Sequence, residues 1–153
     1  MKPRKLIIVI SLLLCAVGMN AQSDFFDKMA GSRNVNSVYI SKAMLSMAPN
    51  IHMGGANIRD IANKLEQLEI YTAESKESST MMKKDIEVLA RNKTYELLMN
   101  LKDGMQTITF YALKNKDKFR ELIMVTKETD QCVIIRMVGD FTMADIQKVT
   151  SKR

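Results

Sequence analysis

The chain has 153 residues, of which 46% are hydrophobic and 26% are charged, and its formal net charge is +6. This composition excludes an intrinsically disordered chain, and the length fits one ordinary domain. Lys2, Arg4 and Lys5 supply three of the surplus positive charges, so the rest of the chain carries only +3, which does not indicate a nucleic-acid partner.

Residues 1–21 have the pattern of a secretory signal peptide. The basic start MKPRK precedes an apolar run of 14 residues, 6–19, and polar residues follow. A transmembrane helix needs about 20 apolar residues, so this run is short for a membrane span. We expect cleavage near Ala21, export to the periplasm or cell surface, and no stable transmembrane segment in the mature chain. A lipid anchor on Cys15 and an uncleaved N-terminal anchor are the alternatives.

After the leader, short elements are predicted. Three apolar side chains within residues 24–30 share a face at helical spacing, and residues 35–40 (VNSVYI) favour a strand. Ser41 is a good cap for a short helix, which Pro49 ends. The Asn and paired Gly of residues 50–55 predict a loop.

Residues 57–68 show the most regular helical pattern. Their apolar side chains form one continuous stripe, which comprises Ile58, Ile61, Ala62, Leu65 and Leu68. A strand is predicted at residues 69–73. Residues 76–101 are predicted to be mostly helical, with a kink or break at residues 92–94.

The rest of the fold is organised around residues 105–140. Three apolar, β-branched runs, MQTITFYAL, FRELIMVT and QCVIIRMVG, are separated by short polar links, which predicts a three-strand antiparallel meander. Asp103 and Gly104 supply the turn that leads into this meander. Thr142 is the N-cap of a last helix, and Asp145, three residues later, completes a variant of the capping box. We therefore predict an α+β fold: a single domain, residues 22–153, with a largely antiparallel sheet of about five strands and helices mainly on one face.

The residues with chemical potential do not form a recognisable catalytic set. His52 is the only histidine, and no GxSxG sequence frames a serine nucleophile. Cys132 is the only cysteine after the leader and lies in an apolar run, which predicts a buried, inert thiol. No spacing singles out a pair among the 17 acidic residues. We predict no catalytic residues and no cofactor.

One metal site is a candidate. Met44, Met47, His52 and Met53 lie within ten residues of each other. Thioether ligands with one imidazole suit copper(I). Packing of Met44 and Met47 at helical spacing is the simpler interpretation, because methionine is common throughout the chain.

Four stretches carry a family resemblance: residues 37–44 (SVYISKAM), 95–98 (YELL), 121–125 (ELIMV) and 138–146 (VGDFTMADI). In this order the chain resembles a family of small exported bacterial proteins, the domain of unknown function numbered 4252. The resemblance implies a signal peptide and an envelope setting in a Bacteroidetes-type bacterium. It implies no activity and assigns no functional residues.

The sequence therefore favours an exported, non-enzymatic module of the cell envelope that binds another envelope protein or a surface component. Its methionines and short amphipathic segments offer adaptable apolar surface. A small envelope hydrolase with an unrecognised site and a Met-rich copper-binding protein are the alternatives.

Overall fold

A computed structural model describes residues 20–47, 52–53 and 56–151. The chain divides into two compact units, Met1–Arg33 and Asn34–Arg153. In the first unit, helix α2 (Asn20–Ala30) includes the predicted amphipathic segment, and the Gly31 N–H donates to the Asp27 carbonyl at 3.0 Å. The predicted signal peptide lies almost entirely outside the described residues. Cleavage and export therefore stay predictions.

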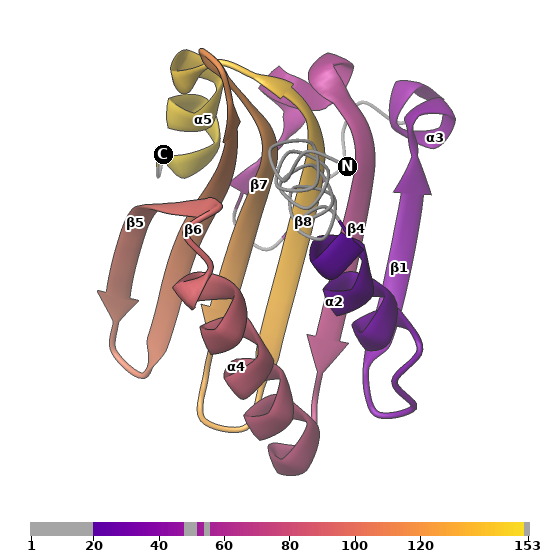
Figure 1. The fold of residues 1–153 in the computed structure, drawn as a ribbon, viewed down its shortest axis with the longest axis vertical. Helices are drawn as coiled ribbons and strands as arrows, with labels where there is room; N and C mark the ends of the chain where they lie inside the picture. The colour runs from indigo at the N-terminus through magenta and orange to yellow at the C-terminus, as the bar shows by residue number, and fades with distance from the viewer. Residues whose placement is uncertain (1–19, 48–51, 54–55, 152–153) are drawn as a thin grey trace, which may run out of the picture. The chain divides into compact units, whose positions relative to one another are not determined.

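The second unit is built on one antiparallel sheet, which has six strands within the described residues (Figure 1). Their order across the sheet is β1-β4-β8-β7-β6-β5. Their bounds are β1 (Asn36–Ser41), β4 (Leu65–Ala73), β5 (Tyr95–Asp103), β6 (Gln106–Asn115), β7 (Lys118–Lys127) and β8 (Cys132–Phe141). The α+β class and the predicted meander, β6–β7–β8, are confirmed, whereas the expected count of about five strands was too low.

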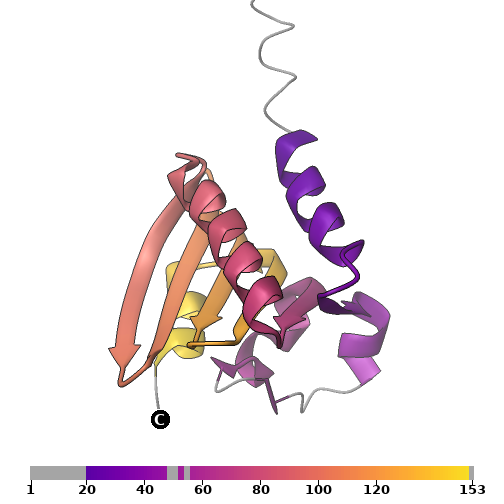
Figure 2. The same cartoon turned by 90° about the horizontal axis from the view of Figure 1, so that it is seen from below.

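Helices lie on both faces of this sheet (Figure 2). One face, which we call the three-helix face, packs against α3 (Lys42–Met47), η1 (Arg59–Lys64) and α5 (Met143–Thr150). The opposite face, the α4 face, packs against the longest helix of this unit, α4 (Lys76–Arg91). The expectation of helices mainly on one face is therefore incomplete.

The central strands bury side chains on both faces. Leu122 and Met124 of β7 belong to the core of the three-helix face, while their neighbours Ile123 and Val125 point to the α4 face and are fully buried. This is why the meander has nearly continuous apolar runs instead of a strict alternation with polar residues. The burial of these side chains is the main source of stability for the sheet.

The helix predicted over residues 57–68 is confirmed only in part. Arg59–Lys64 form the short 3-10 helix η1, and β4 begins at Leu65. The register of β4 on β8 shifts between Leu65 and Gln67, which marks a β-bulge. Because the bulge inserts one extra residue, Leu65 and Leu68 face the same core although they are three positions apart. A bulged strand thus has the apolar spacing of a helix.

The helical structure predicted to continue to residue 101 is wrong beyond Arg91. Helix α4 ends at Arg91, and the next described element is strand β5. The register of β5 on β6 shifts between Leu97 and Met99. This second bulge places Leu98 and Met99 on the same face, against the core of the three-helix face, whereas Tyr95 points to the α4 face.

Three local predictions are confirmed. Thr142 and Asp145 form a capping box at α5, in which the Thr142 N–H donates to Asp145 Oδ2 at 2.8 Å. Gly104 lies in the β5–β6 turn with a φ of +61°. Helix α3 follows β1 directly, as the cap at Ser41 predicted.

The loop predicted at residues 50–55 contains the two-residue strand β2 (His52–Met53), which pairs with β3 (Ala56–Asn57). The other residues of that loop lie outside the described part. No helix among the described residues is long and apolar enough to cross a membrane.

Candidate functional site

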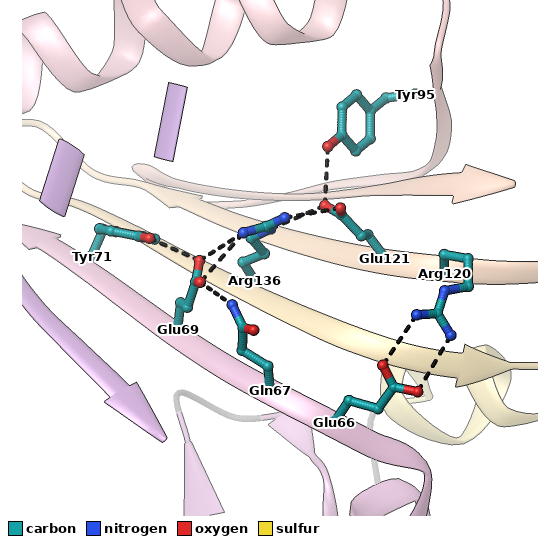
Figure 3. Close-up of polar contacts among 8 residues, drawn as sticks. All are labelled: Glu66, Gln67, Glu69, Tyr71, Tyr95, Arg120, Glu121 and Arg136. Carbon is teal, nitrogen blue, oxygen red and sulfur yellow. Dashed lines mark hydrogen bonds and ion pairs between the residues drawn. The ribbon is translucent and has the colours of Figure 1, made fainter. Parts of the chain in front are cut away.

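The α4 face carries a network of charged and polar side chains from four strands (Figure 3). The network comprises Gln67, Glu69 and Tyr71 of β4, Tyr95 of β5, Glu121 of β7 and Arg136 of β8. The antiparallel register places Glu69 directly opposite Arg136. Glu121 lies on β7, on the other side of β8, and its carboxyl group accepts a hydrogen bond from the same guanidinium group of Arg136.

Arg136 bridges the two carboxyl groups. Its Nε and Nη2 donate to the two oxygens of Glu121 at 3.0 and 2.9 Å, and its Nη1 donates to those of Glu69 at 3.1 and 3.3 Å. The side chains of Arg136, Glu69 and Glu121 are only 14%, 11% and 10% exposed. Two-pronged arginine–carboxylate contacts of this kind fix geometry as well as charge.

Neutral donors complete the network. The hydroxyl of Tyr71 donates to Glu69 at 2.8 Å, and the hydroxyl of Tyr95 donates to Glu121 at 3.0 Å. The amide of Gln67 donates to the remaining oxygen of Glu69. All four carboxyl oxygens therefore accept at least one hydrogen bond.

Burial and the neighbouring carboxyl groups keep two of the donors, Tyr95 and Arg136, in their protonated forms. Burial, reinforced by the negative charge of Glu121, raises the pKa of Tyr95 well above its usual range. Burial alone would lower the pKa of Arg136, but the hydrogen bonds and charges of Glu121 and Glu69 outweigh burial and raise it. Neither donor has a pKa near neutrality, which efficient general acid–base catalysis requires. The geometry fits a structural network that holds β4, β7 and β8 in register.

Sequence reasoning missed this network, because its members are up to 69 positions apart in the chain. One signal could have indicated it. Glu121 and Arg136 each interrupt an apolar strand run, at positions that a buried sheet normally gives to apolar side chains.

An open hollow of about 670 Å³ lies at the end of the sheet where the β5–β6 and β7–β8 turns meet. Its acidic lining residues are Glu74, Asp103, Glu128 and Asp130. Lys83 of α4 reaches this end of the sheet and donates to the carbonyls of Glu128 and Thr129. Within the described residues, no group of three or more His, Cys, Asp or Glu side chains has the geometry to hold a metal ion.

The predicted copper ligands are only partly described. Met44 and Met47 lie on α3 with side chains 55% and 80% exposed. His52 and Met53 form β2, and their side chains lie outside the description. The copper site therefore stays a prediction.

The thiol of Cys132 is buried, as predicted. Burial raises its pKa to about 11, against the opposing charges of Lys127 and Lys83. A thiol with this pKa is almost entirely protonated at neutral pH, and the thiolate is the reactive form.

Among the described residues, the edge strand β1 carries two exposed apolar side chains. Val38 and Tyr39 are 50% and 64% exposed, and within the described part of the chain β1 pairs only with β4. Its six residues, NSVYIS, include no charged residue and no proline, and their register on β4 has no bulge. Charged residues, prolines and bulges are the features by which natural sheets usually protect their edges from pairing with other chains, and β1 has none of them.

The opposite edge, β5, has this protection. It carries Glu96, Lys102 and Asp103, and the bulge after Leu97 distorts its outline. The two edges therefore differ in the property that decides whether a strand accepts a partner. We take β1 as the candidate binding surface.

Comparison with known proteins gives one match. The family model described as "Domain of unknown function (DUF4252)" matches residues 26–149, which include β1 and the whole charge network. No curated protein matches the chain, and no solved structure does.

Proposed function

We propose that this chain, which belongs to the DUF4252 family, is an exported, non-enzymatic module that binds another protein through the β1 edge of its sheet. The observation that supports this function is the contrast between an exposed, uncharged β1 and a charged, bulged β5. Export to the cell envelope is part of the proposal and rests on the pattern of the first 21 residues.

An open strand edge is a common site of peptide and protein recognition. The outward N–H and C=O groups of the strand form main-chain hydrogen bonds with an added strand, and the side chains on either face give specificity. In β1, Val38 points to the three-helix face and Tyr39 to the α4 face, since they lie opposite Ile70 and Glu69 of β4. An added strand would contact apolar or aromatic surface on both faces.

The charge network supports a binding role more than a catalytic one. Its carboxyl oxygens are engaged by Arg136, Gln67 and two tyrosine hydroxyls. A network of this kind stiffens the central strands, and a rigid sheet presents its edge in a fixed conformation.

Site-specific photo-crosslinking in living cells tests the proposal. A photoreactive residue replaces Tyr39 in the full chain, and Leu97, which is 57% exposed on β5, is replaced in the matched control. We expect a recurrent protein adduct at position 39 and none at position 97. Adducts at neither position, or the same adducts at both, would contradict the proposal.

Copper(I) binding is a second candidate, favoured by the exposure of the Met44 and Met47 thioethers on α3. Thioethers are soft ligands that select copper(I). Titration of the full chain with copper(I), compared with the Met44→Leu/Met47→Leu variant, decides this candidate. Binding that is unchanged in the variant would exclude a site at these residues.

A further inference from the structure

We infer that the protein that occupies β1 is a second copy of this chain, paired antiparallel through β1 with Tyr39 opposite Tyr39. This inference rests on the proposed function, because it names the partner of the same edge. It follows from the pattern of side chains along residues 36–41, from their exposure and from the absence of charge within this strand.

Antiparallel pairing of two identical strands allows only certain registers. Directly opposite residues point to the same face of a sheet, so a two-fold axis through one residue pairs it with its own copy. An axis at Tyr39 pairs Val38 with Ile40 of the second copy and Ser37 with Ser41 of the second copy. Every residue from 37 to 41 then faces a residue of similar polarity.

This register extends both faces of the sheet. Ile40 is partly buried against the core of the three-helix face, on which Val38 is half exposed. Pairing of Val38 with Ile40 of the second copy would continue the same apolar row across the interface. On the α4 face, two Tyr39 side chains would form an aromatic cross-strand pair.

The neighbouring registers are less complementary. An axis at Val38 places Asn36 opposite Ile40, and an axis at Ile40 places Tyr39 opposite Ser41. Each of these sets an apolar or aromatic side chain against a polar one. The centre at Tyr39 avoids both mismatches.

Only five residues of each copy, 37–41, form the pair, so the interface belongs to the small size class, below about 1,200 Å² in total. We therefore expect reversible association that depends on protein concentration, and not an obligate dimer.

Cysteine crosslinking tests the register. In the full chain with Cys15→Ser, the Tyr39→Cys variant places two thiols on directly opposite residues. The Cα atoms of such residues are about 4.5–5.5 Å apart, within the range of about 4.4–6.8 Å that a disulfide spans. Cys132 is buried and does not compete for disulfide formation. We expect a disulfide-linked dimer after mild oxidation, and none from the matched Leu97→Cys variant.

A mixture of two variants identifies the axis. Ser37→Cys and Ser41→Cys chains are expected to crosslink when mixed and to crosslink poorly alone, because residues 37 and 41 are opposite only in the register centred on Tyr39. Crosslinking of Ser37→Cys to Tyr39→Cys in place of this pair would contradict that register.

Sedimentation of the purified full chain tests association directly. We expect a monomer–dimer equilibrium that Tyr39→Lys abolishes, since two lysines would then face each other, and that Leu97→Lys leaves unchanged. Tyr39 is 64% exposed, so we expect its replacement by lysine to leave the fold intact. The melting temperature of the variant checks this. A wild-type chain that stays monomeric at its highest soluble concentration overturns the inference.

The cellular adducts separate this inference from the proposed function. An adduct at position 39 between two copies of this chain supports both. An adduct with a different protein, together with a monomeric purified chain, overturns the inference and leaves the function standing. No adduct and a monomeric chain overturn both.

Discussion

Arg136 illustrates why an ion-pair network in a sheet is sensitive to the loss of one member. Two carboxyl groups, Glu69 and Glu121, lie on either side of its guanidinium group in a mostly buried setting (Figure 3). Without Arg136, these carboxyl groups would be buried close together without a counter-charge. Breaking a buried ion pair in this way is far more destabilising than breaking an exposed one.

We therefore expect Arg136→Met to lower the free energy of unfolding by about 3–5 kcal/mol. Urea denaturation of the purified chain measures this loss. Arg120→Met is the matched control, because Arg120 pairs with Glu66 at 3.1 Å with both side chains more than a third exposed. It is expected to change stability by less than about 1 kcal/mol. Equal losses in the two variants would contradict a structural role for the network.

Asp145 gives a prediction about pH. Burial alone would raise the pKa of its carboxyl group, but hydrogen bonds from Lys64 and Thr142 lower it from 3.8 to about 2. The ion pair with Lys64, at 2.6 Å, joins η1 to the start of α5. Because the folded-state pKa is lowered, the stabilisation is complete above about pH 4 and disappears as the pH falls towards about 2.

We expect Asp145→Asn to lose about 1–2 kcal/mol of stability at neutral pH, a range that allows for solvent screening at Lys64, whose side chain is 38% exposed. The difference in free energy of unfolding between this variant and the wild type should become smaller as the pH falls from about 4 to about 2. Urea denaturation at several pH values measures both effects. Asp140→Asn is the control, since its pair with Lys118 is about half exposed. A loss in Asp145→Asn that does not change with pH would contradict the ion pair as its source.

At the scale of elements, bulges explain which parts of the fold the sequence did not predict. The meander, the first strand and the last helix follow from apolar runs, turn residues and a capping box, all of which are local signals. The helix predictions for residues 65–68 and 95–101 are wrong, because a bulge in each strand places on one face residues that simple alternation would place on opposite faces. Whether such a stretch is helical is decided by pairing with distant strands, which a local pattern does not contain.

The candidate surfaces divide in the same way. The charge network was missed because it is assembled from four strands, and only the register brings Glu69, Glu121 and Arg136 together. The lack of charge in β1 is visible in the sequence, but its place at the edge is not. The strand order places this uncharged segment at the edge of the sheet, and for this reason it is a candidate binding surface.

Gly139 tests the bulge in β4. It lies opposite Leu65, and a Cβ atom added there would be 2.3 Å from the Lys64 carbonyl oxygen and 2.7 Å from the Phe141 ring. We expect Gly139→Ala to lower the free energy of unfolding by about 3 kcal/mol, because backbone and a core aromatic ring would both have to shift.

Gly104→Ala is the control for Gly139→Ala. Gly104 has a φ of +61° but open space around it, so only the strain of the left-handed conformation, about 1–2 kcal/mol, is expected. Thermal or urea denaturation gives both values. A Gly139→Ala variant as stable as Gly104→Ala would contradict the close approach of η1 to β8.

At the scale of the whole sheet, the two edges have opposite character. β5 is bulged and charged, whereas β1 is regular, uncharged and partly apolar on both faces. This asymmetry directs association to one edge. Two copies joined through β1 would form a closed pair whose outer edges are both β5, so that growth into a longer assembly stops.

The most direct measurement is amide hydrogen exchange of the purified full chain over a range of concentrations. We expect the outward-facing amides of β1 to gain protection as concentration rises, because a second β1 strand accepts their hydrogen bonds. The outer amides of β5 should exchange at a constant rate. Protection of β1 that does not depend on concentration, or a gain at β5 instead, would contradict self-association through the β1 edge.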